Sequence, residues 1–192
     1  MLRPEYPIRT ERLTLRPFAD GDYDDLHLMT GDPDVVRYLY WEVHTPEETR
    51  SALARRKGQT ALTDEGQWLV LAMEAAPAGE PRVVGQVVLR WASVVHRQGE
   101  LGFTLSPAFQ GHGYAREAAE AMLGLGFESL GLHRIYAACD TRNAPSWGLL
   151  TRLGMRREAH FVEDEIFKGE YGDQYIYAML DREWKERQSS SR

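Results

Sequence analysis

Two glycines separated by one residue, Gly111 and Gly113, stand where a strand-like run gives way to a helix-like one. Glycine tolerates positive φ angles and lets a bulky group approach the backbone. The first amides of a helix have no partner within it, and the helix dipole adds about half a positive charge at that end. The turn could therefore bind an anion such as a pyrophosphate. By itself, the glycine pair is equally compatible with a tight connection that binds nothing.

Two common nucleotide-binding motifs fit this turn poorly. No Lys-Ser or Lys-Thr pair follows the second glycine, as it would in a P-loop. Arg116 occupies the place of the third glycine of a dinucleotide-binding fingerprint, and the preceding segments do not alternate strand with helix. The turn therefore indicates an anion site of another kind.

Three strand-like runs precede the turn and a helix-like run follows it. Their composition and alternation predict strands at Gln67–Met73, Val83–Trp91 and Glu100–Leu105. The short connections between these runs favour antiparallel hairpins. An apolar stripe at helical spacing predicts a helix from Ala115 to Leu130, so the turn should join the last strand to this helix.

Further elements are expected on both sides of this region. Before it we expect a strand from Leu13 to Phe18, a helix after Asp20, and a second helix that starts at Pro46. After it we expect a strand at Arg134–Cys139, a helix between Asn143 and Gly154, and a strand at Tyr175–Leu180. The pattern predicts one α+β domain over residues 1–187, with residues 188–192 as a disordered tail.

Composition limits the class of protein. The 192 residues are 43% hydrophobic and 27% charged, which is enough for a sizeable core. A formal net charge of −6 argues against a general nucleic-acid binder, and we interpret the basic run Arg55-Arg56-Lys57 as a solvated helix end. No run has the length of a membrane span. The single cysteine, Cys139, cannot form an internal disulfide, so we expect a cytoplasmic protein.

The turn and its surroundings resemble the GNAT superfamily of N-acetyltransferases. The family signature is Gln or Arg, two residues, Gly, one residue, then Gly or Ala, and Gln110, Gly113 and Ala115 match it. The resemblance also covers Thr10–Pro17, Glu100–Phe103, Asn143–Ser146 and Leu153–Glu158, and is greatest to the branch that acetylates ribosomal-protein N-termini. It implies a GNAT-like, mixed, mostly antiparallel central sheet flanked by helices, in which a splayed strand pair holds acetyl-CoA.

The resemblance implies where this cofactor lies. Its pyrophosphate would rest on the turn, and its pantetheine between the strand ending at Leu105 and the strand before Asp140. Asn143 and Ser146 resemble the family's Asn-x-x-Ser element, although Asn143 is also a good helix cap. No spacing of histidines, cysteines or carboxylates is typical of a metal site. The expected cofactor contacts are Phe103, Thr104, Leu105, Gln110, Gly111, His112, Gly113, Tyr114, Ala115, Asn143 and Ser146.

In the family the amine attacks the thioester directly, so Cys139 has no required role. Deprotonating the amine at pH 7 costs about 1 kcal/mol for an α-amine and about 5 kcal/mol for a lysine. Glu100 is the first candidate base because it lies beside the expected thioester, although an exposed glutamate at a strand end is an equal alternative. Many relatives protonate the thiolate with a tyrosine, but Leu150 occupies that position. Ser146 is therefore proposed to contact the sulfur or an attendant water.

The acceptor end is less determined by the resemblance. Tyr38 and Trp41 fall where the ribosomal branch walls its acceptor pocket. Glu158 and Asp173 fall where it places acidic residues near the acceptor, and they are further candidates for the base. The acceptor is predicted to be a protein or peptide N-terminal amine. The alternatives are a small-molecule amine or antibiotic, and a non-catalytic acyl-CoA sensor. Trp184, expected to be exposed near the C-terminus, suggests a homodimer.

Overall fold

The computed structural model describes residues 1–77 and 79–190. In chain order its elements are β1 (Ile8–Arg9), β2 (Thr14–Arg16), η1 (Asp20–Asp22), α1 (Tyr23–Thr30), α2 (Pro33–Val36), α3 (Pro46–Gly58), β3 (Trp68–Ala75), β4 (Arg82–Ser93), β5 (Gln98–Leu105), η2 (Pro107–Phe109), α4 (Tyr114–Gly124), the π-helical η3 (Leu125–Ser129), β6 (Arg134–Asp140), α5 (Ala144–Arg152), β7 (Arg156–Phe167), β8 (Glu170–Leu180) and α6 (Asp181–Ser190). Among these helices, none is long and apolar enough to cross a membrane.

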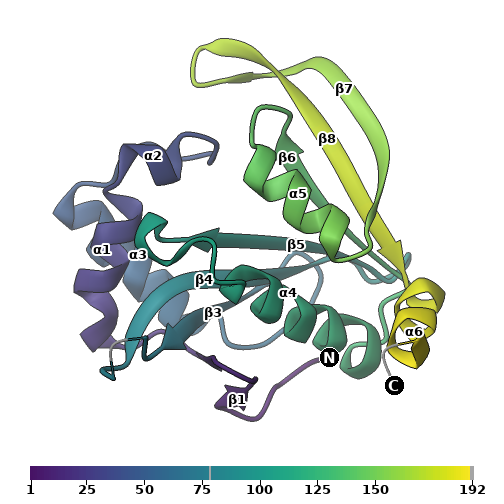
Figure 1. Cartoon of the computed structure of the whole chain (residues 1–192), viewed down its shortest axis with the longest axis horizontal. Helices are drawn as coiled ribbons and strands as arrows, with labels where there is room; N and C mark the ends of the chain where they lie inside the picture. The colour runs from purple at the N-terminus through teal and green to yellow at the C-terminus, as the bar shows by residue number, and fades with distance from the viewer. Residues whose placement is uncertain (78, 191–192) are drawn as a thin grey trace.

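The strands form one sheet in the order β1-β2-β3-β4-β5-β6-β8-β7 (Figure 1). Neighbours pair antiparallel except β5 and β6, which are parallel. Their pairing covers three residue pairs, from Gln98 with Arg134 to Glu100 with Tyr136. Beyond these pairs β5 continues to Leu105 and β6 to Asp140, so the two strands separate toward their carboxyl ends. The predicted mixed, mostly antiparallel α+β sheet with a splayed strand pair is confirmed.

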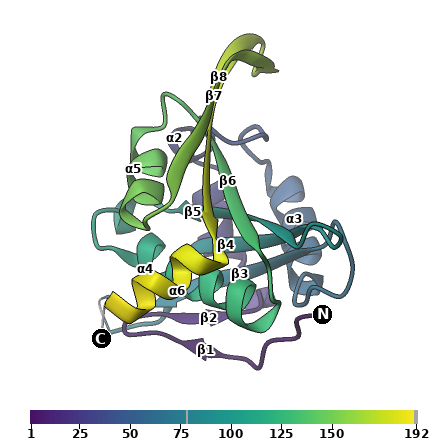
Figure 2. The same ribbon diagram turned by 90° about the vertical axis from the view of Figure 1, so that its right-hand side faces the viewer.

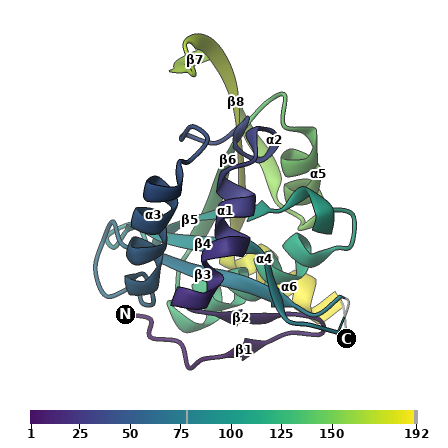
Figure 3. The same cartoon turned by 90° about the vertical axis from the view of Figure 1, so that its left-hand side faces the viewer.

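Helices cover both faces of the sheet. Alternate residues of β3 point to opposite faces, so Leu69 and Leu71 pack in the cluster that contains Met122 of α4, while Val70 packs with Leu53 of α3. Figure 2 shows α4 and α3 on opposite sides of β3 and β4, and Figure 3 shows α1 beside α3. The sheet therefore lies between a layer with α4 and a layer with α1 and α3.

A long hairpin of β7 and β8 extends beyond the rest of the molecule (Figure 1). Its two-residue connection, Lys168 and Gly169, has φ angles of 51° and 87°, as a type I′ turn requires. The sequence analysis did not predict β7, because its charged run Arg156–Phe167 is exposed almost throughout and has no apolar alternation. Only its pairing with β8 makes it a strand.

Two expectations about the C-terminus were wrong. Residues 188–190 belong to α6 rather than to a tail, and residues 191–192 lie outside the described part of the chain. Trp184 is 4% exposed rather than exposed, because it stacks on Phe127 at 6.1 Å and its Nε1 donates to Glu128 at 2.7 Å. Its burial removes the reason that the sequence offered for a homodimer.

Candidate active site

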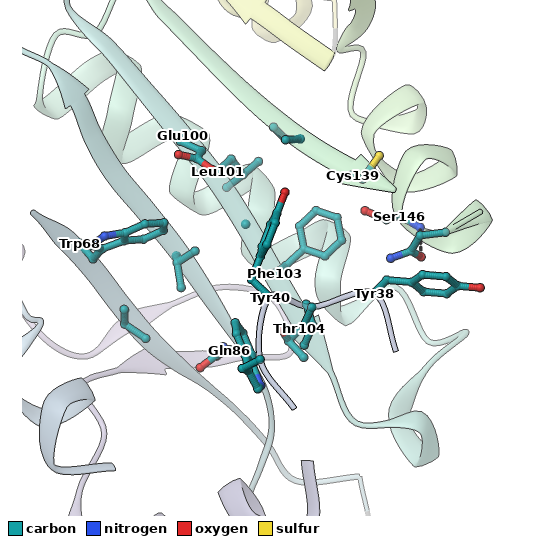
Figure 4. Close-up of a pocket in the computed structure, with 18 of the residues that line it drawn as sticks. Tyr38, Tyr40, Trp68, Gln86, Glu100, Leu101, Phe103, Thr104, Cys139 and Ser146 are labelled. Carbon is teal, nitrogen blue, oxygen red and sulfur yellow. Dashed lines mark hydrogen bonds between the residues drawn. The ribbon is translucent and has the colours of Figure 1, made fainter. Parts of the chain in front are cut away.

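A cavity of about 400 Å³ opens where β5 and β6 separate (Figure 4). Four groups of residues line it: Glu100–Thr104 and Ala137–Cys139 of the two strands; Asn143, Ser146 and Leu150 at α5; Tyr38–Trp41 and His44 before α3; and Arg55, Arg56, Gln59, Trp68, Val70, Gln86 and Val88 from α3, its end and the sheet. The cavity therefore joins the splayed strands to the loop between α2 and α3. It contains both predicted catalytic residues, Glu100 and Ser146.

The free edge of β5 directs backbone amides into this gap. Ser106 N donates to Val84 O of β4, and the amides of an antiparallel strand alternate in direction. The Thr104 amide therefore points toward β4, whereas those of Phe103 and Leu105 point toward the separated β6. Because β5 pairs with β6 only as far as Glu100, these two donors face the gap between the strands.

The glycine-rich turn follows β5 and has the geometry of an anion cradle. Gly111 and Gly113 have φ angles of 80° and 82°, and Gly113 precedes the first residue of α4. Within the described residues, the amides from Gly111 to Arg116 donate no hydrogen bond. Six successive unpaired donors at the start of a helix favour a phosphate-like anion. Gln110 Nε2 instead contacts Leu105 O at 3.4 Å.

A contact from the N-terminal strand region supports the turn. Arg12 Nη1 donates to His112 O at 2.7 Å, and Arg12 Nε donates to Glu117 Oε2 at 2.8 Å. Burial alone would raise the pKa of Glu117, but hydrogen bonds from Thr10 and Arg12 outweigh it and hold this pKa below its usual value. The sequence analysis included Thr10–Pro17 in the resemblance but assigned it no role; the structure shows that it braces the turn.

Glu100 is half-buried and held by two donors. Its Oε2 accepts from Arg90 Nη1 and from the Tyr136 hydroxyl, each at 3.3 Å. Burial, followed by the nearby Glu100 carboxylate, raises the pKa of Tyr136, so the phenol stays protonated and able to donate. Sequence reasoning missed Arg90 and Tyr136, because both lie opposite Glu100 only through the pairing of β5 with β4 and β6.

Asn143 and Ser146 meet at the start of α5. Asn143 Oδ1 accepts from Ser146 N at 3.2 Å, so Asn143 caps the helix. The Ser146 hydroxyl lies beside Cys139, whose pKa is raised to about 11 by burial, with a smaller opposing effect of the Ser146 hydrogen bond. Leu150 is fully buried in the cavity wall. Because the Cys139 thiol is protonated and Leu150 is apolar, the polar side chains in this part of the cavity are those of Ser146 on α5 and of Asn143, which caps that helix.

The tip of the β7–β8 hairpin holds the loop between α2 and α3. Lys168 Nζ donates to Val36 O at 2.9 Å and to Trp41 O at 3.1 Å. The Tyr40 hydroxyl donates to Glu165 at 2.7 Å and accepts from Gln174 at 2.8 Å. The loop that carries Tyr38 and Trp41 is therefore fixed over the cavity by residues more than a hundred positions later in the chain.

On the activity that the family resemblance implies, replacing Lys168 with methionine is expected to raise KM for the acceptor amine several-fold while leaving KM for acetyl-CoA unchanged. The variant loses two charge-assisted hydrogen bonds that hold the loop, each contributing about 1.5–3 kcal/mol. Steady-state kinetics with each substrate varied in turn measure the effect, with the exposed Lys185→Met as control. Equal changes in the KM values for the amine and for acetyl-CoA would contradict a role of Lys168 that is confined to the acceptor.

The acidic residues predicted for the acceptor end have different positions. Asp173 lines a small adjoining cavity that shares Tyr38 and Tyr40 with the main one. Glu158 lines neither; it pairs with Arg134 and Arg156, and these hydrogen bonds hold its pKa below normal although burial opposes them. The strand β7, which the sequence analysis did not predict, thus places Glu158 in an ion-pair cluster outside both cavities.

Comparison with known proteins agrees with this geometry. The model of the acetyltransferase (GNAT) domain matches residues 12–156. The chain is 33% identical over 177 residues to the uncharacterized N-acetyltransferase YnaD of Bacillus subtilis (strain 168), covering 92% of this chain and 98% of the relative. It is 25% identical over 162 residues to spermidine N(1)-acetyltransferase of Vibrio cholerae serotype O1, covering 84% and 89%.

A solved structure shows the same fold. The crystal structure of the GNAT-family acetyltransferase from Bacillus anthracis matches with a TM-score of 0.81 at 33% identity, covering 95% of this chain and 100% of that one. The domain match, the relatives and the splayed β5–β6 pair lead to one conclusion: the chain belongs to the GNAT family of acetyl-CoA-dependent N-acetyltransferases.

Proposed function

We propose that the chain acetylates a small primary amine that enters the cavity beneath the loop between α2 and α3. The observation that carries this proposal is the continuity of one cavity from the β5–β6 gap to Tyr38, Tyr40 and Trp41, with Glu100 in its wall. An amine placed there lies beside both a carboxylate and the separated strands. The volume of about 400 Å³ suits a small molecule.

The residues present fit acetyl-CoA. The unpaired amides from Gly111 to Arg116 would hold its pyrophosphate, and a side chain at Gly113 would come within 3.2 Å of the Arg12 guanidinium that braces the turn. The amides of Phe103 and Leu105 would face the pantetheine arm and the acyl oxygen. Asn143 and Ser146 would line the opposite wall. When bound, acetyl-CoA supplies an activated acetyl thioester.

The chain's own residues then account for the proton transfers. Glu100 removes one proton from the protonated amine, directly or through a water, so that the nitrogen lone pair can form the new N–C bond as the C–S bond breaks. The second nitrogen proton then passes to the departing sulfur or to water. The Phe103 amide stabilises the negative charge that develops on the acyl oxygen. The electron pair of the broken bond leaves on sulfur, and Ser146 or a water bound to it supplies a hydrogen bond there. The free thiol's ordinary pKa of about 8.5 makes a dedicated acid dispensable.

Two similarities to known proteins point to different classes of acceptor. The resemblance to the ribosomal-protein branch predicts a peptide N-terminus, whereas the similar Vibrio cholerae protein is a spermidine acetyltransferase. The enclosing contacts of Lys168 and Tyr40 over the cavity favour a small molecule over an extended chain, because they close the loop across it.

An amine panel tests this proposal. Release of free coenzyme A is followed with amino acids, spermidine, an aminoglycoside, and tripeptide amides that begin with Ala or Ser. Small amines are expected to be the better acceptors. Faster reaction of the tripeptides would instead support the predicted N-terminal acceptor. Binding of acetyl-CoA by calorimetry without thiol release against any amine would identify a non-catalytic sensor and overturn the proposed function.

A further inference from the structure

Arg56 is a buried cation in the acceptor cavity. The sequence pattern around Arg55-Arg56-Lys57 predicts a solvated helix end, but Arg56 is 8% exposed and lines the cavity. The prediction holds for Arg55 and Lys57, which are exposed, and fails for Arg56, which lies on the face of α3 that packs on the sheet. There its Nε donates to Gln86 Oε1 of β4 at 2.7 Å. Gln86 is 5% exposed. A basic residue assigned to solvent is thus part of the cavity floor.

This guanidinium has no carboxylate partner among the described residues. Within the described residues its one side-chain hydrogen bond is to the neutral Gln86, and its Cζ lies 6.0 Å from the Phe18 ring centroid. Burial, followed by repulsion from Arg55, lowers the pKa of Arg56 to about 10. A buried charge normally has a partner of opposite sign, because its desolvation is otherwise uncompensated. Within the described residues its two terminal nitrogens make no hydrogen bond, and the residue lines the cavity.

Two further unpaired polar atoms belong to residues that line the same cavity as Arg56. Trp41 Nε1 and His44 Nδ1 are buried and make no hydrogen bond within the described residues, and both residues line the same cavity. Their rings are 6.3 Å apart. Burial and then the charge of Arg56 lower the pKa of His44, so its neutral form is favoured. Indole N–H groups only donate, so this end of the cavity is suited to an acceptor of hydrogen bonds.

The acidic group of the cavity is at its other end. Among the described lining residues Glu100 is the one carboxylate, and it already accepts from Arg90 and Tyr136. Gln86 pairs with Thr104, four residues along β5 from Glu100, which corresponds to about 13 Å. Figure 4 shows Glu100 and Gln86 at opposite ends, with Phe103 and Tyr40 between them. The cavity thus has an anionic end and a cationic end.

We propose that the Arg56 end binds a carboxylate of the acceptor, so that the preferred substrate is a small amine that carries a carboxylate at its other end. The proposal rests on the acetyltransferase function proposed above. With Nε engaged by Gln86, Nη1 and Nη2 match the two oxygens of a carboxylate. The amine then extends toward Glu100. A polyamine would place a second cation against Arg56 and is disfavoured.

The test compares acids with their amides. The probes are ω-amino acids with one to five methylene groups, their carboxamides, and spermidine. For the wild-type protein, the best acid is expected to exceed its amide in kcat/KM by about tenfold or more, as loss of a charge-assisted hydrogen bond implies. Arg56→Met should raise KM for the acid, bring the acid-to-amide ratio near one, and leave KM for acetyl-CoA unchanged. Arg56→Lys should retain part of the preference.

Controls separate this role from a structural one. Arg50→Met makes the same change on the same helix at an exposed position outside the cavity and should keep the preference. Thermal unfolding checks that Arg56→Met is folded, as expected when a buried cation is replaced by an apolar side chain. A preference that survives Arg56→Met, a preference of the wild type for amides or spermidine, or a change confined to KM for acetyl-CoA would overturn the proposal.

A binding measurement keeps the two proposals distinguishable. In a calorimetric experiment, each of the ω-amino acids with one to five methylene groups is titrated into the protein saturated with coenzyme A. Weaker binding to Arg56→Met than to wild type supports the carboxylate site even if no amine is acetylated, which would refute only the proposed catalytic function. Equal binding to both forms would overturn the carboxylate site whatever the catalytic result.

Discussion

Glu100→Gln is expected to lower kcat about a hundredfold, the lower part of the range for general acid–base catalysis. Glutamine keeps the size of the side chain and can still accept from Tyr136, but it cannot take the amine proton. KM for acetyl-CoA should be unchanged, because Glu100 lies on the strand and not on the glycine-rich turn. Rates of coenzyme A release at saturating acetyl-CoA measure the effect.

The pH dependence of this variant provides a second observation. An alkyl amine has a pKa of about 10, as the lysine side chain does, so its unprotonated form becomes abundant only near and above that pH and then needs no base. The ratio of wild-type to variant rates should therefore fall as the pH approaches and passes about 10. Glu158→Gln is the matched control, because Glu158 lies in an ion-pair cluster away from the cavity and should leave kcat unchanged.

Other outcomes would reassign the base. A Glu100→Gln variant with wild-type turnover, or a rate ratio that stays constant with pH, would remove Glu100 from proton transfer. Ser146→Ala should lower kcat less than Glu100→Gln, because a hydroxyl that only donates a hydrogen bond to the departing sulfur contributes less than a base. Turnover unchanged by Ser146→Ala would remove Ser146 from the reaction.

Gly113→Val is expected to raise KM for acetyl-CoA by roughly 10- to 100-fold. Gly113 has a φ of 82°, which an L side chain rarely adopts, and a Cβ there would lie 3.2 Å from Arg12 Nη2. Relief of this strain must move the turn and redirect its free amides. Loss of one charge-assisted hydrogen bond costs about 1.5–3 kcal/mol, which corresponds to that range. The dissociation constant for coenzyme A, from calorimetry, should rise in parallel.

Gly131→Val is the control for backbone strain. Gly131 has a φ of 73° with no atom near its missing Cβ, and it lies between η3 and β6, away from the turn. Both variants should lose similar free energy of unfolding, but only Gly113→Val should lose cofactor affinity. Normal affinity for coenzyme A in Gly113→Val would show that the turn does not hold the pyrophosphate.

Local patterns determined much of this protein. Interactions between residues close in the sequence, where backbone geometry and periodicity act, account for three features. These are the position of the glycine-rich turn between a strand and a helix, the Asn143 cap and the central strands. The family signature at Gln110, Gly113 and Ala115 rests on the same kind of short-range information, and the splayed sheet that it implies is present.

Only the tertiary structure decided which groups share the cavity. A charged run such as Arg156–Phe167 becomes a strand through its pairing with β8, and that strand places Glu158 in an ion pair with Arg134. Arg56 and Trp184 are polar or amphipathic residues whose burial depends on which face of a helix meets the sheet. Sequence spacing identifies the residues that can do chemistry, but contacts between distant segments determine the charges around each of them. Here these contacts place Arg56 in the same cavity as Glu100, at its other end.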